Sequence, residues 1–229
     1  MTAYLFEPAP PTSLQIEGDR RRFPVHRVYC VARNYAAHAR EMGRDPEREP
    51  PFFFSKPADA VVPGGGRIPY PGATGELHHE VELVVALGSG GADVAAHDAL
   101  GLVHGYAVGV DLTRRDLQSE AKAAGRPWDT AKGFDRSAPV GVLAPAARVG
   151  HPRAGSIALD VNGEPRQRGD LAEMIWSVPE VIAHLSHFYR LAPGDLIFTG
   201  TPAGVSALAP GDRVDACIAD LPSLDLAIT

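Results

Sequence analysis

Two glutamates near the middle of the chain, Glu80 and Glu82, have a spacing that could bind a metal ion. Side chains alternate between the faces of a strand, so a strand over residues 80–87 would place both carboxylates on one face. Like charges on one face repel unless a cation neutralises them. Asp111 ends a second strand-like run, residues 103–110, and could join them. Three carboxylates suit Mg²⁺ or Mn²⁺ better than Zn²⁺. The spacing alone also fits an exposed strand edge that carries ordinary glutamates.

His38 and Glu41 form a second candidate pair, which could act together in general-base catalysis. Residues 34–41 are predicted to form a short helix that stops at Gly43, and side chains three positions apart share one helix face. A glutamate can hold an imidazole in one tautomer, and the two can then activate water. The alternative is a polar surface helix.

Arg115 and Gln118 lie three positions apart in a predicted helix and would project from one face. Thr113 and Asp116 have the spacing of a capping box, so we expect the helix to begin there and to run to about Gly125. Arginine binds carboxylates with two hydrogen bonds, and glutamine offers both a donor and an acceptor. The alternative is a solvated basic face that includes Arg114, Lys122 and Arg126.

Two further segments could bind anions. Lys132 lies in an aromatic-flanked segment, residues 128–134, where an ammonium group could stabilise a developing enolate. The same side chain could instead extend along apolar surface with its charge in water. Thr201 lies in the glycine-bearing turn at residues 199–204, whose backbone N–H groups could hold a carboxylate. A tight structural turn is the alternative.

The elements that must position these residues are mostly strands. The chain has 24 glycines and 21 prolines, which favour short strands and many turns over a helical bundle. The Asn162-Gly163 pair suits a type I′ turn and predicts a hairpin. Ser177 and Glu180 have capping-box spacing and predict a helix to about Arg190. The expected strands cover residues 27–31, 52–54, 80–87, 103–110, 156–161, 196–198, 214–218 and 224–228. Many strands with only a few helices, in no regular strand–helix alternation, fit a mixed or antiparallel β-rich fold.

The bulk composition narrows the class of protein. The 229 residues suffice for one catalytic domain, and a formal net charge of −6 argues against a nucleic-acid partner. An anionic substrate is still compatible, because local arginines and lysines set the potential inside a pocket. The two cysteines form no disulfide framework, and we see neither a leader peptide nor a membrane-length apolar run. We therefore expect a cytoplasmic protein without a membrane partner.

Six motifs follow one another along the chain in a fixed order. They are Val31-Ala32-Arg33-Asn34-Tyr35 with His38 and Glu41, Phe54-Ser55-Lys56-Pro57, Leu77-His78-His79-Glu80-Val81-Glu82-Leu83, Asp111 through Gln118, Lys132, and Thr199-Gly200-Thr201-Pro202. Taken together, this order resembles the fumarylacetoacetate hydrolase family over roughly residues 25–229. Within that family the chain is most similar to the small bacterial fumarylpyruvate hydrolases and then to acylpyruvate hydrolases.

The resemblance implies a fold and a set of roles. The fold would be α+β and β-rich, a mixed β-sandwich roll with a few peripheral helices. An N-terminal arm (residues 1–24) would precede a single catalytic domain (25–229), assembled as a homodimer. Glu80, Glu82 and Asp111 would bind Mg²⁺ or Mn²⁺, and His38 and Glu41 would activate water on a helix that closes over the substrate. The remaining implied site residues are Lys132 as a catalytic group and Arg33, Arg115, Gln118 and Thr201 as substrate contacts.

The implied reaction is metal-dependent hydrolysis of a carbon–carbon bond in a 2,4-dioxo acid. Fumarylpyruvate, cleaved to fumarate and pyruvate in gentisate-type aromatic degradation, is the expected substrate. Oxaloacetate decarboxylation, acylpyruvate hydrolysis and 2-oxo-diene isomerisation are alternatives that use the same metal and enolate chemistry. From another class, the chain could bind a cation without catalysis.

Overall fold

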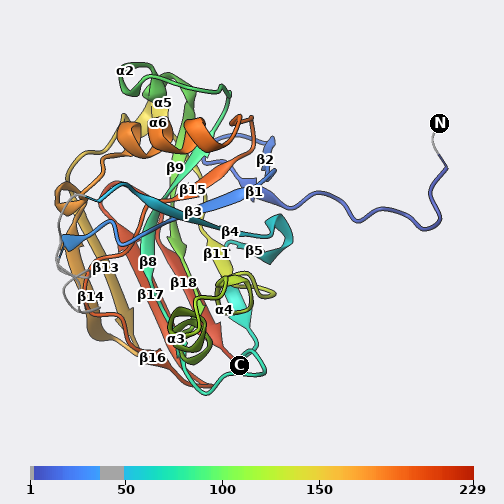
Figure 1. The fold of residues 1–229 in the computed structure, drawn as a ribbon, viewed down its shortest axis with the longest axis vertical. Helices are drawn as coiled ribbons and strands as arrows, with labels where there is room; N and C mark the ends of the chain where they lie inside the picture. Colours follow the sequence, from blue (N-terminus) through green and yellow to red (C-terminus); the bar gives the residue numbers. More distant parts are fainter. Residues whose placement is uncertain (1–2, 37–48) are drawn as a thin grey trace.

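The computed structural model describes residues 3–36 and 49–229 (Figure 1). Its centre is an eight-stranded mixed sheet in the order β4-β3-β15-β8-β9-β11-β5, with β12 also paired to β9. The strands are β3 (Val28–Ala32), β4 (Phe52–Lys56), β5 (Val61–Pro63), β8 (Val81–Leu87), β9 (Val103–Val110), β11 (Ala138–Val140), β12 (Ala144–Pro145) and β15 (Leu196–Phe198).

Strand β8 lies in the middle of this sheet and is buried along its whole length. Alternate side chains enter two different cores: Leu83 and Val85 belong to one hydrophobic cluster, whereas Val84 and Ala86 belong to another. Both faces of the sheet are therefore covered, which explains why the second half of the strand is uniformly apolar.

A second, five-stranded sheet packs against one face of the central sheet. Its order is β14-β13-β17-β18-β6, and the Asn162-Gly163 turn that joins β13 to β14 has positive φ at both residues (55° and 79°), as the predicted type I′ turn requires. Leu159 and Val214 point into the cluster that also contains Leu83. The strands are β6 (Gly66–Ile68), β13 (Ser156–Val161), β14 (Glu164–Asp170), β17 (Arg213–Ile218) and β18 (Leu224–Ile228).

A hairpin of β1 (Ser13–Gln15) and β2 (Arg22–Pro24) helps to cover the other face. Leu14 and Phe23 from this hairpin are buried in the same cluster as Val84. Residues 13–24, which we expected to belong to an arm, thus contribute to the core, while Figure 1 shows the chain before them extending away from the body. The boundary between arm and domain at residue 24 stays a prediction.

The helices lie at the periphery, in two groups at opposite ends of the view in Figure 1. Ser177 and Glu180 form the predicted capping box, since the Ser177 N–H and hydroxyl both donate to Glu180 Oε2 (3.0 and 2.7 Å). None of the helices within residues 3–36 and 49–229 is long and apolar enough to cross a membrane. The helices are α2 (Ala96–Ala99), α3 (Arg115–Ala123), α4 (Asp129–Lys132), α5 (Ala146–Val149) and α6 (Val178–Phe188), with 3₁₀ turns η1 (Ala58–Ala60), η2 (Leu100–Leu102) and η3 (Leu171–Glu173).

The predicted capping box at the start of α3 is wrong. Thr113 belongs instead to β10 (Thr113–Arg114), which pairs with β7 (Leu77–His78), and β7 also pairs with β16 (Ala207–Leu208). The Thr113 hydroxyl bonds to the carbonyl oxygen of Asp111 (3.2 Å) rather than to the helix backbone. This small sheet ties the segment before β8 to the start of α3, and it thereby fixes the two elements that carry the predicted metal ligands and substrate contacts.

Candidate metal centre and active site

The structure brings the three predicted metal ligands together. Glu80 directly precedes β8, Glu82 lies within it, and Asp111 directly follows β9, the antiparallel neighbour of β8. The Asp111 N–H donates to the Glu80 carbonyl oxygen (2.8 Å), which holds the two segments in register. One carboxylate oxygen from each residue lies within 4.8 Å of the others, and all three side chains are buried.

Buried cations neutralise two of these carboxylates. Lys132 Nζ lies 2.8 Å from Glu80 Oε2 and 2.6 Å from Asp111 Oδ2. Lys56 Nζ lies 2.7 Å from Asp111 Oδ1, and Arg115 Nη2 lies 2.5 Å from Glu80 Oε1. Lys56 was missed from the sequence as a site residue, although a lysine in the apolar run Phe52–Lys56 is a signal of a buried charge pair.

Glu82 differs from its two neighbours. Its carboxylate accepts the Gly200 N–H (2.6 Å), but no lysine or arginine of residues 3–36 and 49–229 forms an ion pair with it. Burial, reinforced by the charges of Asp111 and Glu80, raises the pKa of Glu82 well above its usual value. A cation that contacts Glu82 would favour the ionised form. The donor set, three carboxylate groups with oxygen ligands only, fits Mg²⁺ or Mn²⁺.

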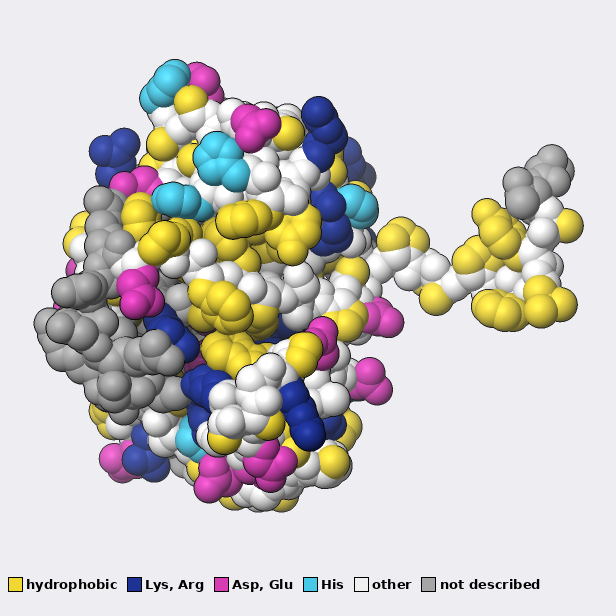
Figure 2. Space-filling model, viewed as in Figure 1, with side chains coloured by type: hydrophobic (Ala, Val, Ile, Leu, Met, Phe, Trp, Pro, Cys, Tyr) yellow, Lys and Arg dark blue, Asp and Glu magenta, His cyan; other side chains and the backbone are white. Residues whose placement is uncertain are grey.

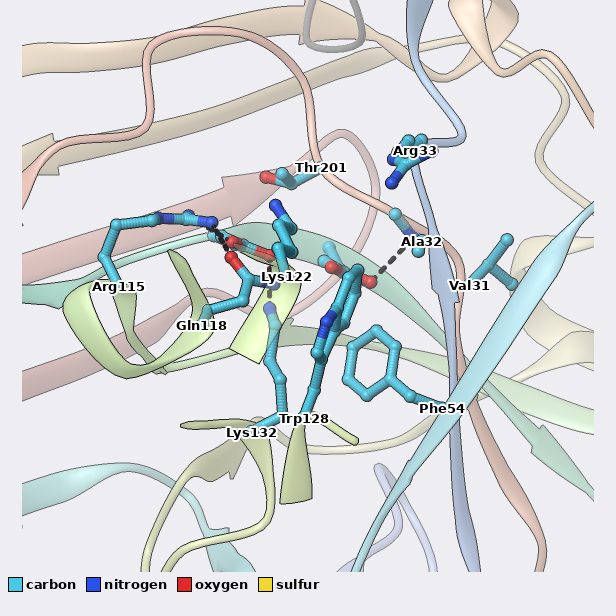
Figure 3. A pocket seen from close by; sticks show the side chains of 13 residues that line it. Val31, Ala32, Arg33, Phe54, Arg115, Gln118, Lys122, Trp128, Lys132 and Thr201 are labelled. Atoms are coloured by element: carbon cyan, nitrogen blue, oxygen red, sulfur yellow. Dashed lines mark hydrogen bonds and ion pairs between the residues drawn. The ribbon is translucent and has the colours of Figure 1, made fainter. Parts of the chain in front are cut away.

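A pocket opens onto this cluster and gathers most of the predicted site residues (Figure 3). Arg33 contributes from the segment after β3, and Arg115 and Gln118 contribute from α3. Figure 3 shows Phe54 and Trp128 side by side on one wall, with Lys132 on the other side of Trp128. His38 and Glu41 lie outside the described residues. The lining residues are Val31, Ala32, Arg33, Phe54, Glu80, Glu82, Arg115, Gln118, Lys122, Trp128, Lys132, Gly200 and Thr201.

Arg115 is bound largely by the protein itself. Its Nη2 donates to Glu80, and its Nη1 donates to Gln118 Oε1 (2.5 Å). The Gln118 side-chain amide nitrogen is therefore the part of that residue left to donate to a ligand. Direct contact between Arg115 and a substrate carboxylate stays a prediction.

Thr201 is held by a hydrogen-bond network that the sequence did not reveal. Its hydroxyl donates to the Val81 carbonyl oxygen (2.7 Å) and accepts from Gln167 Nε2 (2.8 Å). Gln167 Oε1 accepts the Val81 N–H (3.0 Å) and lies 2.9 Å from His79 Nδ1, so His79 carries its proton on Nδ1. Burial lowers the pKa of His79, which keeps the ring neutral. Gln167 thereby positions Thr201 beside β8.

The turn before Thr201 requires glycine. Gly200 has φ of +97°, and a Cβ atom there would lie 2.7 Å from Asn34 Cβ. Asn34 is fully buried, and its Nδ2 donates to the carbonyl oxygens of Thr199 and Trp176 (2.8 Å each). Asn34 therefore links β15, the turn and the segment before α6.

The lysines of the pocket have pKa values shifted in opposite directions. Burial by itself lowers the pKa of Lys132, but the charges of Asp111 and Glu80 outweigh burial and raise it above its usual value, so Lys132 stays protonated. Burial, followed by the charges of Arg115 and Arg33, lowers the pKa of Lys122 to about 8.

Fold and site together define a β-rich protein with a buried carboxylate cluster suited to a divalent cation and a cationic pocket above it. Residues 27–229 match the model of the fumarylacetoacetate (FAA) hydrolase C-terminal family. The chain therefore belongs to the fumarylacetoacetate hydrolase family, and the expected β-rich roll is confirmed.

Several relatives are similar over most of their length. The crystal structure of fumarylpyruvate hydrolase from Pseudomonas aeruginosa in complex with Mn²⁺ and pyruvate is 55% identical, with a TM-score of 0.98 over 99% of each chain. A fumarylpyruvate hydrolase from Ralstonia sp is 41% identical over 189 residues, which cover 82% of this chain and 98% of that protein. An oxaloacetate tautomerase from Escherichia coli (strain K12) is 42% identical over 193 residues, which cover 84% of this chain and 88% of that protein.

Proposed function

We propose that this protein is a divalent-metal-dependent hydrolase that cleaves fumarylpyruvate to fumarate and pyruvate. The observation that carries this assignment is the match, at 55% identity and over 99% of both chains, to the fumarylpyruvate hydrolase solved with Mn²⁺ and pyruvate. The buried carboxylates Glu80, Glu82 and Asp111 supply oxygen ligands for the same kind of ion in this chain.

The proposed chemistry is addition of water across one carbon–carbon bond. The oxygen of water bonds to C4 of the substrate, the C3–C4 bond breaks, and its electron pair leaves C3 as pyruvate enolate, which a proton then converts to pyruvate. When bound at the carboxylate cluster, the divalent cation would hold the carboxylate and 2-oxo oxygens of the substrate and polarise the ketone.

Lys132 is proposed to stabilise the negative charge that develops on the enolate. Its ammonium is fixed by Glu80 (2.8 Å) and Asp111 (2.6 Å), so it needs no reorganisation during the reaction. The raised pKa of Lys132 keeps that charge present.

The other site residues keep the roles that the family resemblance gives them, as proposals. Gln118, with its amide nitrogen free to donate, and Arg33, at the pocket wall, would contact the substrate together with Thr201. His38 and Glu41 would form the pair that removes a proton from water. Replacing His38 with Ala should then lower kcat more than it raises KM, which steady-state kinetics would check.

Oxaloacetate tautomerisation is the second candidate, because named oxaloacetate tautomerases are 42–44% identical to this chain. That reaction moves a proton without breaking a carbon–carbon bond, so it uses enolate stabilisation but no attacking water. Oxaloacetate decarboxylation and cleavage of other acylpyruvates draw on the same groups. These reactions give different products, so identifying the products distinguishes them.

The test is product analysis of the purified protein with fumarylpyruvate, acetylpyruvate and oxaloacetate, each with Mn²⁺, with Mg²⁺ and with EDTA. We expect Mn²⁺- or Mg²⁺-dependent release of fumarate and pyruvate, abolished in Glu82→Gln and retained in the exposed control Glu76→Gln. The hydrolase assignment would be overturned if oxaloacetate were the only substrate that reacted, either by an enol–keto shift of unchanged mass or by loss of carbon dioxide.

A homodimer, a cytoplasmic location and a role in aromatic degradation are also proposed. An aromatic surface next to the pocket supports the dimer: Phe188 packs on Phe53 and Phe52 packs on Trp128, with ring centroids 6.2 and 5.2 Å apart. Phe52, Phe188 and Tyr189 are 52%, 70% and 43% exposed, and Figure 2 shows hydrophobic side chains gathered on this face. Light scattering that gave a monomer mass would refute the dimer.

A further inference from the structure

The three lysines of this chain all lie at one site. Of the 22 basic residues, 19 are arginines, and only Lys56, Lys122 and Lys132 are lysines. Lys56 and Lys132 contact Asp111 beneath the pocket, and Lys122 lines the pocket itself. The first two therefore have partners in the carboxylate cluster, whereas the role of Lys122 is not explained by that cluster.

Helix α3 directs Lys122 into the pocket. Arg115, Gln118 and Lys122 are spaced by three and four residues, so they share one face of the helix, and all three line the pocket. Figure 3 shows the end of the Lys122 side chain reaching toward Thr201. Its Nζ lies 5.1 Å from the ring centroid of Trp128, which supplies a cation–π contact.

Lys122 lacks a counter-charge within the part of the chain that the structure describes. No carboxylate there pairs with it, whereas Lys56, Lys132 and Arg115 form ion pairs with Asp111 or Glu80. Burial and the charges of Arg115 and Arg33 make a further positive charge unfavourable at this position, which is why the pKa falls to about 8. An anionic ligand group beside Lys122 would offset the unfavourable energy of the buried positive charge.

The burial of Lys132 and Lys122 indicates which end of a substrate each of them meets. Lys132 is 2% exposed and lies against the carboxylate cluster, where the proposed function places the pyruvoyl end. Lys122 is half-buried and so lies closer to solvent along the same pocket. A linear substrate anchored at the cluster would extend its acyl group toward Lys122.

We infer that Lys122 binds the carboxylate at the far end of the acyl group and so selects 2,4-dioxo acids whose acyl group ends in a carboxylate. The inference rests on the proposed function, because it assumes that the pyruvoyl end binds at the carboxylate cluster. A hydrogen-bonded ion pair in a partly desolvated pocket gives both affinity and discrimination against a neutral acyl group.

The experiment compares wild type, Lys122→Met, Lys122→Arg and Arg126→Met on two substrates that differ in charge, fumarylpyruvate and acetylpyruvate, with saturating Mn²⁺. Lys122→Met should lower kcat/KM for fumarylpyruvate about 10- to 100-fold, mainly through KM, as expected for loss of one charged hydrogen bond. Its kcat/KM for acetylpyruvate should stay within about threefold of wild type. Lys122→Arg should retain most of the preference, and Arg126→Met, which removes an exposed charge beyond the end of α3, should resemble wild type.

A second readout separates binding from general damage to the fold. Fumarate should inhibit wild-type cleavage of acetylpyruvate competitively, and Lys122→Met should raise its inhibition constant about 10-fold or more. Equal losses on both substrates, or no loss on either, would overturn the inference while the hydrolase assignment stood. Cleavage of neither substrate by wild type would instead refute the proposed function and the inference with it.

Discussion

Replacing Glu82 with Gln tests whether the buried carboxylate cluster is the metal site. The amide has the shape of the carboxylate, and its oxygen can still accept the Gly200 N–H, which lies 2.6 Å from Glu82 Oε2. The substitution removes a charge that is buried beside Asp111 and Glu80 and has no ion pair with any described lysine or arginine. The metal-free variant should therefore be at least as stable as metal-free wild type.

The size of the effect follows from linkage between metal binding and folding. A metal present at about 100 times its Kd stabilises the folded state by about 2.7 kcal/mol. For a protein of this size, that free energy raises Tm by about 5 to 10 °C. Even a lost outer-shell partner typically weakens metal binding about 10- to 100-fold, so loss of a direct ligand should cost about 100-fold or more. At the same metal concentration the variant would then gain only about 0.4 kcal/mol, or about 1 °C.

The assay is thermal unfolding in EDTA and across a Mn²⁺ titration, with the exposed Glu76→Gln as the control that should keep the full shift. A Glu82→Gln variant that kept a wild-type Mn²⁺-induced rise in Tm would show that the ion binds elsewhere. A metal-free variant that melted well below metal-free wild type would show that the protein itself stabilises the Glu82 charge, which would contradict the electrostatic argument.

Three further predictions follow from contacts in the site. Lys132→Met should lower kcat about 100-fold or more while Mn²⁺ still raises Tm, because the proposed role of Lys132 is to stabilise charge in the reaction and not to bind the metal. Loss of the Mn²⁺-induced rise in Tm would assign Lys132 to metal binding instead. Gln167→Leu should lower the free energy of unfolding, measured by urea denaturation, by about 2–4 kcal/mol, because it breaks four buried hydrogen bonds. The control substitution Gln15→Leu, at an exposed position, should change this free energy little. Equal effects of the two substitutions would refute the hydrogen-bond network around Gln167. Lys122→Met should raise the free energy of unfolding by about 1 kcal/mol at pH 7, after allowance for solvent screening of a half-buried charge. Because folding depresses the pKa of Lys122 from 10.5 to about 8, wild type recovers this stability as the pH rises from 8 to 10.5, and an advantage of the variant that persisted at pH 10.5 would contradict the sign.

Local sequence patterns predicted the elements that hold the candidate metal ligands. Glu80 and Glu82 are spaced for one face of a strand, and the apolar run after them predicted the buried strand β8. The capping box of Ser177 and Glu180 was also correct, because its hydrogen bonds join residues only three positions apart. Such patterns succeed where the interacting groups are close in the chain.

Long-range partners could not be predicted in the same way. Thr113 has the spacing of a helix cap, but strand pairing with His78 and the carboxylate cluster compete for it and prevail. Gln167 and His79 lie 88 positions apart, and no spacing rule relates them. Lys56 gave a recognisable signal of a buried charge, yet its partner Asp111 comes from a distant part of the chain that only the tertiary structure brings to it.

The sequence by itself determined the family, the candidate all-oxygen ligand set and the strands that carry it, since these depend on residue type and short spacing. Only the tertiary structure decided how the charges are compensated: Lys56, Lys132 and Arg115 neutralise two carboxylates, Glu82 has no such ion pair among the described residues, and Lys122 faces the pocket without a described counter-charge. The physical reason is that the energy of a buried charge depends on distances to groups far away in the chain, and folding alone sets those distances.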